Sequence, residues 1–149
     1  MSQAATPMCP SAQHQLEGAQ VFAVIGGTAE HPEVTYLEEA LPVTPEVVAL
    51  AAPVDPAEVF RITAPCAMGP GCWHFDGERQ KCRLAIRTVR LAPVVVSKPP
   101  RCAIRGSCMW WHQEGVSACL RCPQVVTNDA APSERAIETA DPTNLAGAA

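Results

Sequence analysis

The pattern of apolar and polar positions in the first 40 residues predicts a short β-hairpin. Residues 21–26 (VFAVIG) form a β-branched, apolar run that stops at a pair of glycines, which is typical of a strand. Residues 34–37 (VTYL) supply a second such run after a loop over 28–32. We therefore expect these two segments to pair as antiparallel strands.

Two proline-led segments then predict short helices. Residues 44–46 (TPE) provide an N-cap, a proline at the first helical position and an early acid, and the apolar run VVALAA follows. Residues 55–58 (DPAE) repeat this start before VFRI, with Glu58 at the capping-box position. Pro53 separates the two predicted helices.

The second half of the chain contains two more helical segments. Residues 78–91 carry arginines that recur at steps of four, four and three, which places them on one face of a helix. Charge runs of this kind usually form a solvated face, and we expect one here. These arginines are Arg79, Arg83, Arg87 and Arg90. Residues 109–120 predict a further helix, which Gly115 destabilises by about 1 kcal/mol relative to alanine.

The composition limits the core that these elements can build. The 149 residues are enough for one domain, but they include only three tryptophans, three phenylalanines and one tyrosine, against fifteen prolines. A small protein with so few core residues usually needs disulfides or metal to stabilise it. We expect an α+β fold in which a small hairpin with short helices is followed by a metal-stabilised, cysteine-rich half. The predicted segments are a flexible lead at 1–17, a small α/β segment at 18–64, the cysteine-rich domain at 65–125 and a disordered tail at 126–149.

Seven of the eight cysteines lie in this second half and follow one spacing twice. The first copy, at 65–92, has five residues between its first two cysteines and nine before the third. The second copy, at 101–123, has gaps of five and ten and then adds a fourth cysteine. The spacing indicates an internal duplication with one binding site in each copy. The cysteines are Cys66, Cys72 and Cys82 in the first copy, and Cys102, Cys108, Cys119 and Cys122 in the second.

The second copy by itself supplies a complete set of four thiolates, whereas the first copy is one ligand short. Cys9 and His74 are the two candidates for the missing ligand. Cys9 is favoured, because it would complete two sets of four and leave no cysteine over; it could otherwise be a free thiol on the flexible lead. His74, two residues after Cys72, is the alternative. Cys9 and Cys122 are each followed by proline, as the last ligand is in bacterial ferredoxin segments.

Iron–sulfur clusters, zinc and thiol chemistry are three ways to use such sets. Zinc sites usually have two to four residues between paired cysteines, and only Cys119 and Cys122 have that spacing. A [4Fe–4S] core is wider than a single ion and suits the longer gaps, so one or two [4Fe–4S] clusters are the predicted cofactors and zinc is the alternative. Disulfide chemistry at the same pair has less support, because the pair lies at the predicted end of a helix and not at a helix start in a βαβ unit.

The charge distribution agrees with anionic sites in the second half. The net charge is −4, yet residues 1–60 hold eight acids and no lysine or arginine, while residues 61–122 hold ten of the eleven bases. Four thiolates around a cluster leave about two negative charges, which these bases would offset. A nucleic-acid partner is not expected, because nucleic-acid-binding domains are usually strongly basic overall. Four aromatic residues near the cysteines are expected to exclude water from the sites: Trp73, Phe75, Trp110 and Trp111.

Two strings around these cysteines resemble a family of small bacterial cysteine-rich proteins. They are APC at 64–66 followed by CxHFDG at 72–77, and CxIRxxCxWxxxEGxxACxRCP at 102–123. The resemblance brings no established activity, so the functional prediction rests on the ligands themselves.

Patterns typical of secreted proteins, membrane proteins and stand-alone enzymes are missing. Residues 1–11 lack the basic and apolar regions of a secretory signal, and no apolar run reaches the roughly 18 residues that a membrane span needs. A cytoplasmic protein without membrane association is therefore expected. The sequence has neither a phosphate-binding glycine loop nor a Gly-x-Ser-x-Gly motif, which argues against a stand-alone enzyme.

Together these features predict an iron–sulfur accessory protein that transfers electrons to, or senses redox state for, a larger enzyme system, with a protein as its redox partner. The alternative is a zinc-stabilised adaptor that binds a protein or nucleic acid through its basic face. A structural protein in which metal merely replaces a core is a third hypothesis.

Overall fold

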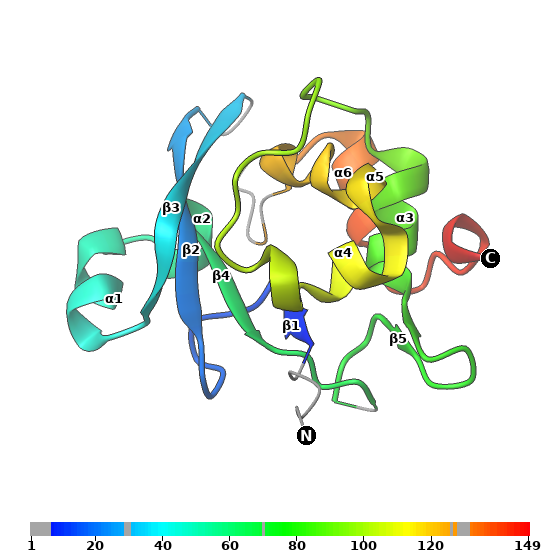
Figure 1. The fold of residues 1–149 in the computed structure, drawn as a ribbon, viewed down its shortest axis with the longest axis horizontal. Helices are drawn as coiled ribbons and strands as arrows, with labels where there is room; N and C mark the ends of the chain where they lie inside the picture. Colours follow the sequence, from blue (N-terminus) through cyan, green and yellow to red (C-terminus); the bar gives the residue numbers. More distant parts are fainter. Residues whose placement is uncertain (1–6, 29–30, 70, 126, 128–131) are drawn as a thin grey trace.

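The predicted hairpin belongs to a larger antiparallel sheet, and short helices lie on both sides of it (Figure 1). The computed structural model describes residues 7–28, 31–69, 71–125, 127 and 132–149. The strand order is β1-β4-β2-β3. The strands are β1 (Met8–Cys9), β2 (Gln20–Gly27), β3 (Pro32–Pro42) and β4 (Phe60–Pro65). The α+β fold class is confirmed.

β2 and β3 form the predicted hairpin, in which Ile25 pairs with Val34. β3 is longer than predicted and runs to Pro42. The register shifts between Val21, which pairs with Leu41, and Ala23, which pairs with Tyr36, so the extra residues 37–40 belong to β3. The loop that joins the strands includes residues 29–30, which lie outside the described part of the chain.

Both proline-led segments begin helices as predicted. α1 (Pro45–Ala51) is capped by Thr44, whose hydroxyl accepts a hydrogen bond from the Val47 amide at 3.3 Å. α2 (Pro56–Val59) has a complete capping box, because the side chains of Asp55 and Glu58 each accept a backbone amide.

α2 ends earlier than the pattern suggests. Residues 60–65 leave the helix and form β4, where Ile62 pairs with Val21 of β2. The segment FRIT contains aromatic and β-branched residues that suit a strand, and pairing with β2 outweighs the preceding helix start. As a result Arg61 lies on a central strand and is fully buried.

The predicted helix at 78–91 begins later, after a small hairpin. β5 (Phe75–Asp76) pairs with β6 (Lys81–Cys82), and α3 (Arg83–Leu91) follows. Asp76 explains the delay, because its carboxylate accepts the amides of Glu78 and Arg79 and thereby holds a turn.

The predicted helix at 109–120 is interrupted at Gly115. α4 (Met109–Glu114) stops there and α5 (Val116–Cys119) begins, since Gly115 has a φ of 68°, a conformation that favours glycine. The 3₁₀ turn η1 (Arg105–Ser107) precedes this pair and η2 (Cys122–Gln124) follows it. The two cysteine copies therefore have different secondary structure, and the duplication is not confirmed beyond the spacing.

The described part of the N-terminal lead is integrated into the fold, contrary to the predicted flexibility of residues 1–17. β1 pairs with β4, and Ala12 is buried. Residues 1–6 lie outside the described residues. A two-residue strand has too short a pattern to be recognised in the sequence.

The described part of the tail is also ordered, although residues 126–149 were expected to be disordered. α6 (Glu134–Ala140) and η3 (Ala146–Ala148) pack against α3. Arg87 of α3 donates from Nε to the Thr139 carbonyl at 2.7 Å. Guanidinium groups thus bind a segment with few apolar residues, which hydrophobic patterning does not predict. Residues 126 and 128–131 lie outside the described residues.

The main core lies between the sheet and the cysteine-rich half. Phe22 of β2 belongs to the same buried cluster as Phe75, Met109 and Trp110. A smaller cluster that contains Val21 packs against α1 on the opposite face of the sheet, because neighbouring strand residues point to opposite faces. Within the residues that the structure describes, no helix combines the length and apolar character needed to cross a membrane.

Candidate metal centres

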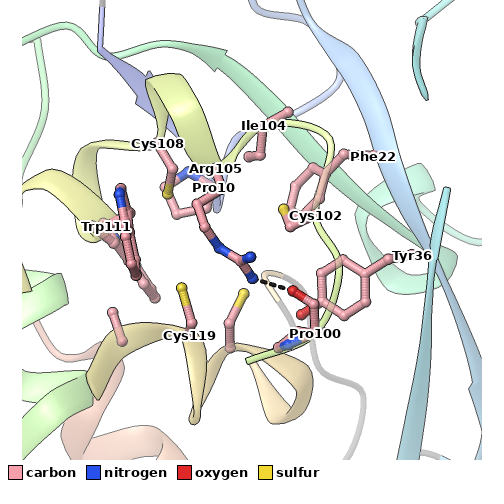
Figure 2. A pocket seen from close by; sticks show the side chains of 13 residues that line it. Pro10, Phe22, Tyr36, Pro100, Cys102, Ile104, Arg105, Cys108, Trp111 and Cys119 are labelled. Atoms are coloured by element: carbon pink, nitrogen blue, oxygen red, sulfur yellow. Dashed lines mark hydrogen bonds between the residues drawn. The ribbon is translucent and has the colours of Figure 1, made fainter. Parts of the chain in front are cut away.

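The four cysteines of the second copy line one hollow beside the sheet (Figure 2). Cys108 is the N-cap of α4, Cys119 is the last residue of α5, and Cys122 is the first residue of η2. Cys102 reaches the hollow from the loop before η1. The hollow is partly open to solvent, and the space in it that water-sized molecules can occupy is about 20 Å³. We call these four residues the second set.

Aromatic and apolar side chains form most of the remaining wall of this hollow. Trp110, which is only 2% exposed, and Trp111 come from α4. Phe22 and Tyr36 come from β2 and β3, and Pro10 comes from the N-terminal segment. Sequence analysis missed the last three, because the local pattern of a hairpin does not say what its inner face covers.

The guanidinium of Arg105 lies among the sulfur atoms of this set (Figure 2). It donates to the Pro100 carbonyl and lies 5.6 Å from the centre of the Trp111 ring. Burial raises the pKa of the Cys119 thiol, and Arg105 opposes that rise. A cation therefore lies between the thiols of the second set (Figure 2).

The structure also brings Cys9 to the three cysteines of the first copy. The pairing of β1 with β4 places Cys9 beside the strand that leads into Cys66. The pKa of Cys9 is raised to about 12, mainly by burial, and the nearby thiols of Cys82, Cys66 and Cys72 contribute to the rise. Burial likewise raises the pKa of Cys82 to about 11, with contributions from Cys72 and Cys66. These four residues form the first set.

His74, the alternative fourth ligand of the first set, has a different partner. Arg87 donates from Nη2 to His74 Nδ1 at 2.6 Å. Burial together with Arg87 lowers the pKa of His74 to about 4, so the ring is neutral at pH 7. Because Nδ1 accepts this bond, Nε2 is the ring nitrogen through which His74 could bind a metal, so the choice between His74 and Cys9 remains a prediction.

A side chain from the second copy holds Cys82 in place. Gln113 of α4 accepts the Cys82 amide at 2.7 Å and donates to the Cys82 carbonyl at 2.9 Å. Cys82 is also the N-cap of α3, where its sulfur accepts the Ala85 amide at 3.4 Å. The backbone of this cysteine is therefore fixed on both sides.

Backbone amides approach several sulfur atoms from two residues further along the chain. Burial raises the pKa of these thiols, to about 12 for Cys108, and the amides act in the opposite direction. Because a donor to sulfur favours the thiolate, these amides offset part of the effect of burial. The pairs are Cys9 with Ser11, Cys66 with Met68, Cys82 with Leu84, Cys102 with Ile104 and Cys108 with Trp110.

A fully buried arginine lies beside the second set. Arg61 of β4 donates from Nη1 to the Cys122 carbonyl at 2.6 Å and from Nη2 to the Pro10 carbonyl at 2.9 Å. Its guanidinium lies 5.3 Å from the centre of the Phe22 ring. Sequence analysis missed this residue, because a single arginine in a short apolar segment gives no signal of its burial.

A second fully buried arginine, Arg87, lies beside the first set and interacts electrostatically with Cys82. Within the described residues, ion pairs between side chains join only Asp76 to Arg79 and Arg83. Neither buried guanidinium is therefore in contact with a carboxylate there.

Two predictions about side chains near the sites are wrong. Trp73 was expected to exclude water from the first site, but it is 85% exposed, because it lies in the loop between Cys72 and β5. The arginine stripe was expected to be a solvated face, but Arg87 is fully buried, where the Thr139 carbonyl and His74 accept its hydrogen bonds. Phe75 and Trp110 are buried as expected.

All eight cysteines are free thiols. In the ranges that the structure describes, no group of three or more His, Cys, Asp or Glu side chains has the arrangement of ligands around one metal ion.

Comparison with known proteins gives no relative for this chain. No family model, no curated protein and no solved structure matches it. The functional argument therefore rests on the residues of the two sets.

Proposed function

We propose that the protein is an iron–sulfur accessory protein that binds a [4Fe–4S] cluster at each set of four cysteines and carries electrons, or senses redox state, for a larger enzyme system. When bound, such a cluster supplies reversible one-electron chemistry. The proposed ligands are Cys9, Cys66, Cys72 and Cys82 in the first set, and Cys102, Cys108, Cys119 and Cys122 in the second.

The observation that carries this proposal is the pair of fully buried arginines beside the two thiol sets, without a carboxylate contact among the described residues. An unpaired buried charge costs several kcal/mol, so buried cations are normally found beside anions. Four thiolates around a [4Fe–4S]²⁺ core carry about two negative charges together. A negative charge of this kind beside each arginine would offset its buried positive charge. Although burial opposes the charge of Arg61, Cys122 and Tyr36 hold its pKa above the ordinary value.

Buried donors beside the thiols support the same kind of group. The Tyr36 hydroxyl and Arg61 interact with the Cys122 thiol, and Arg105 interacts with the Cys119 thiol. Near the first set, Arg87 Nη1 is a buried donor without a hydrogen-bond partner among the described residues. All of these groups can donate, so an acceptor is the partner that suits them. The sulfur atoms of an iron–sulfur centre accept such bonds.

The cysteine spacing favours a cluster over zinc. Zinc sites usually have two to four residues between paired cysteines. The gaps of five residues between the first two cysteines of each copy instead suit the wider [4Fe–4S] core.

The proximity of the two sets supports a role in carrying electrons. Met8, next to Cys9 of the first set, forms a backbone bridge with Cys108 of the second. Pro10, on the other side of Cys9, lines the hollow of the second set. Eight free thiols suit a reducing compartment, so the proposal includes a cytoplasmic location and a protein redox partner.

Purification without oxygen, followed by iron, sulfide and zinc analysis, tests this proposal. Two [4Fe–4S] clusters predict about eight irons and about eight sulfides per chain, a brown colour and a paramagnetic signal after reduction. A double variant, Cys72→Ser with Cys108→Ser, removes one ligand from each set and is the matched control, with loss of most of the iron expected. A colourless protein with stoichiometric zinc would overturn the proposal in favour of the adaptor, and a metal-free protein would overturn both.

A further inference from the structure

We propose that the two centres are unequal, and that Arg61 raises the reduction potential of the second centre above that of the first. The inference rests on the proposed function and adds an order of potentials to it. Arg61 acts here as a positioning residue whose fixed charge lies behind the ligands of one set.

The charge of Arg61 is held rigidly. Its two Nη atoms donate to main-chain carbonyls, at 2.6 Å to Cys122 and at 2.9 Å to Pro10, and its plane packs on Phe22. The residue lies on the central strand β4 and is 0% exposed. Neither water nor side-chain motion therefore screens this charge effectively.

Arg61 is close to the ligands of the second set in particular. It interacts electrostatically with Cys122 first and with Cys108 more weakly, and with the hydroxyl of Tyr36. Tyr36 itself lies beside Cys122, and burial and this thiol raise the tyrosine pKa. A cation and a hydroxyl donor next to the same ligand stabilise the reduced state, which carries one more negative charge.

The first set has a weaker counterpart. Arg87 interacts with Cys82, but it also interacts with Asp141, which offsets part of its charge. His74, which accepts a hydrogen bond from Arg87, has a neutral ring and adds no positive charge near the first set. Solvent near the exposed Trp73 favours the reduced state of the first centre, and this effect would raise the potential of that centre. A unit charge fixed in a buried, low-dielectric contact is the larger of these effects.

A redox titration monitored by electron paramagnetic resonance, on the full chain purified without oxygen, tests the order. Wild-type protein is expected to show two one-electron transitions. In Cys72→Ser only the transition at higher potential remains, and in Cys108→Ser only the transition at lower potential. Arg61→Met is expected to lower the reduced-to-oxidised ratio of the upper transition at least tenfold at the wild-type midpoint. This change corresponds to a decrease of at least 59 mV in the midpoint potential of that transition. The lower transition should not move.

Three further variants keep the result interpretable. Tyr36→Phe removes only the hydroxyl and should lower the upper transition by less than Arg61→Met does, so it decides the matter if Arg61→Met does not fold or loses iron. Arg61→Lys keeps the charge and should restore most of the wild-type potential. Arg135→Met removes an exposed arginine of α6 and should shift neither transition.

Several results would overturn the inference while leaving the proposed function intact. These are equal potentials with full iron content, an upper transition that remains in Cys108→Ser, or equal shifts of both transitions in Arg61→Met. An unmoved upper transition in Tyr36→Phe counts in the same way. Absence of iron from wild-type protein would instead overturn the proposed function itself.

Discussion

The first and second sets share a cysteine spacing but differ in what surrounds them. Around the second set, the inner face of the sheet contributes Phe22 and Tyr36, and Trp110 is buried against them. Around the first set, the supporting groups are polar, with Gln113 on the Cys82 backbone and Trp73 exposed to solvent. Two similar ligand patterns therefore acquire different environments, and environment is what tunes a metal centre.

The backbone hydrogen bonds to the cysteines are similar in the two sets, whereas the surrounding side chains differ. In both sets, amides two residues after a cysteine donate to its sulfur, as at Cys66 and Cys102. This feature follows from local turns and can recur wherever the spacing recurs. The aromatic wall and the buried arginines come from segments far away in the sequence, so the two sets receive different ones.

Removing one thiol from each set in turn gives the largest expected effect. Cys72→Ser and Cys108→Ser should each reduce the iron content from about eight to about four per chain, because the proposed function assigns one cluster of four irons to each set. Iron and sulfide analysis of protein purified without oxygen measures this. If either variant lost all of its iron, the two sets would not be independent sites.

The tryptophans next to the two sets should differ sharply in their contribution to stability. Trp110→Ala, at 2% exposure, is expected to lower the free energy of unfolding by about 3–5 kcal/mol through lost burial and the cavity left behind. Trp73→Ala, at 85% exposure, should change it by no more than about 0.5 kcal/mol. Urea denaturation at matched metal content compares them, and a similar loss in both would contradict the described difference in burial.

Gln113→Leu probes the polar support of the first set. The variant removes both hydrogen bonds to the Cys82 backbone, and the expected loss is about 1–3 kcal/mol in the free energy of unfolding. Iron should leave the first set faster on exposure to a chelator, while the second set should be unaffected.

The matched control for Gln113→Leu is Asp55→Ala, which removes the cap of α2. It should lower stability by about 1 kcal/mol without a change in the release of iron from either set. Equal release of iron from Gln113→Leu and wild-type protein would show that this glutamine does not support the first set.

Local signals in the sequence predicted the features that a few neighbouring residues decide. The hairpin and the caps at Thr44 and Asp55 depend on backbone conformation over a few residues, and they are observed as predicted. Gly115 was expected only to weaken one helix at 109–120, whereas it separates two helices. The division of the cysteines into two groups also follows from spacing, with Cys9 joining the first group.

Contacts between distant segments account for what the sequence could not reveal. The VFRI segment becomes a strand because β2 offers it a partner, and the tail is ordered because Arg87 binds the Thr139 carbonyl. Trp73 is exposed although it adjoins a cysteine, because it lies in a loop outside the shared core.

The amino-acid sequence by itself determined which residues carry soft ligands, how they are grouped and where helices can start. Only the tertiary structure decided which of those ligands lie beneath the sheet, and that Arg61 lies buried beside one set. The physical reason is that a turn is stabilised by its own backbone, whereas the burial of a charge depends on groups that the chain brings from more than 50 residues away.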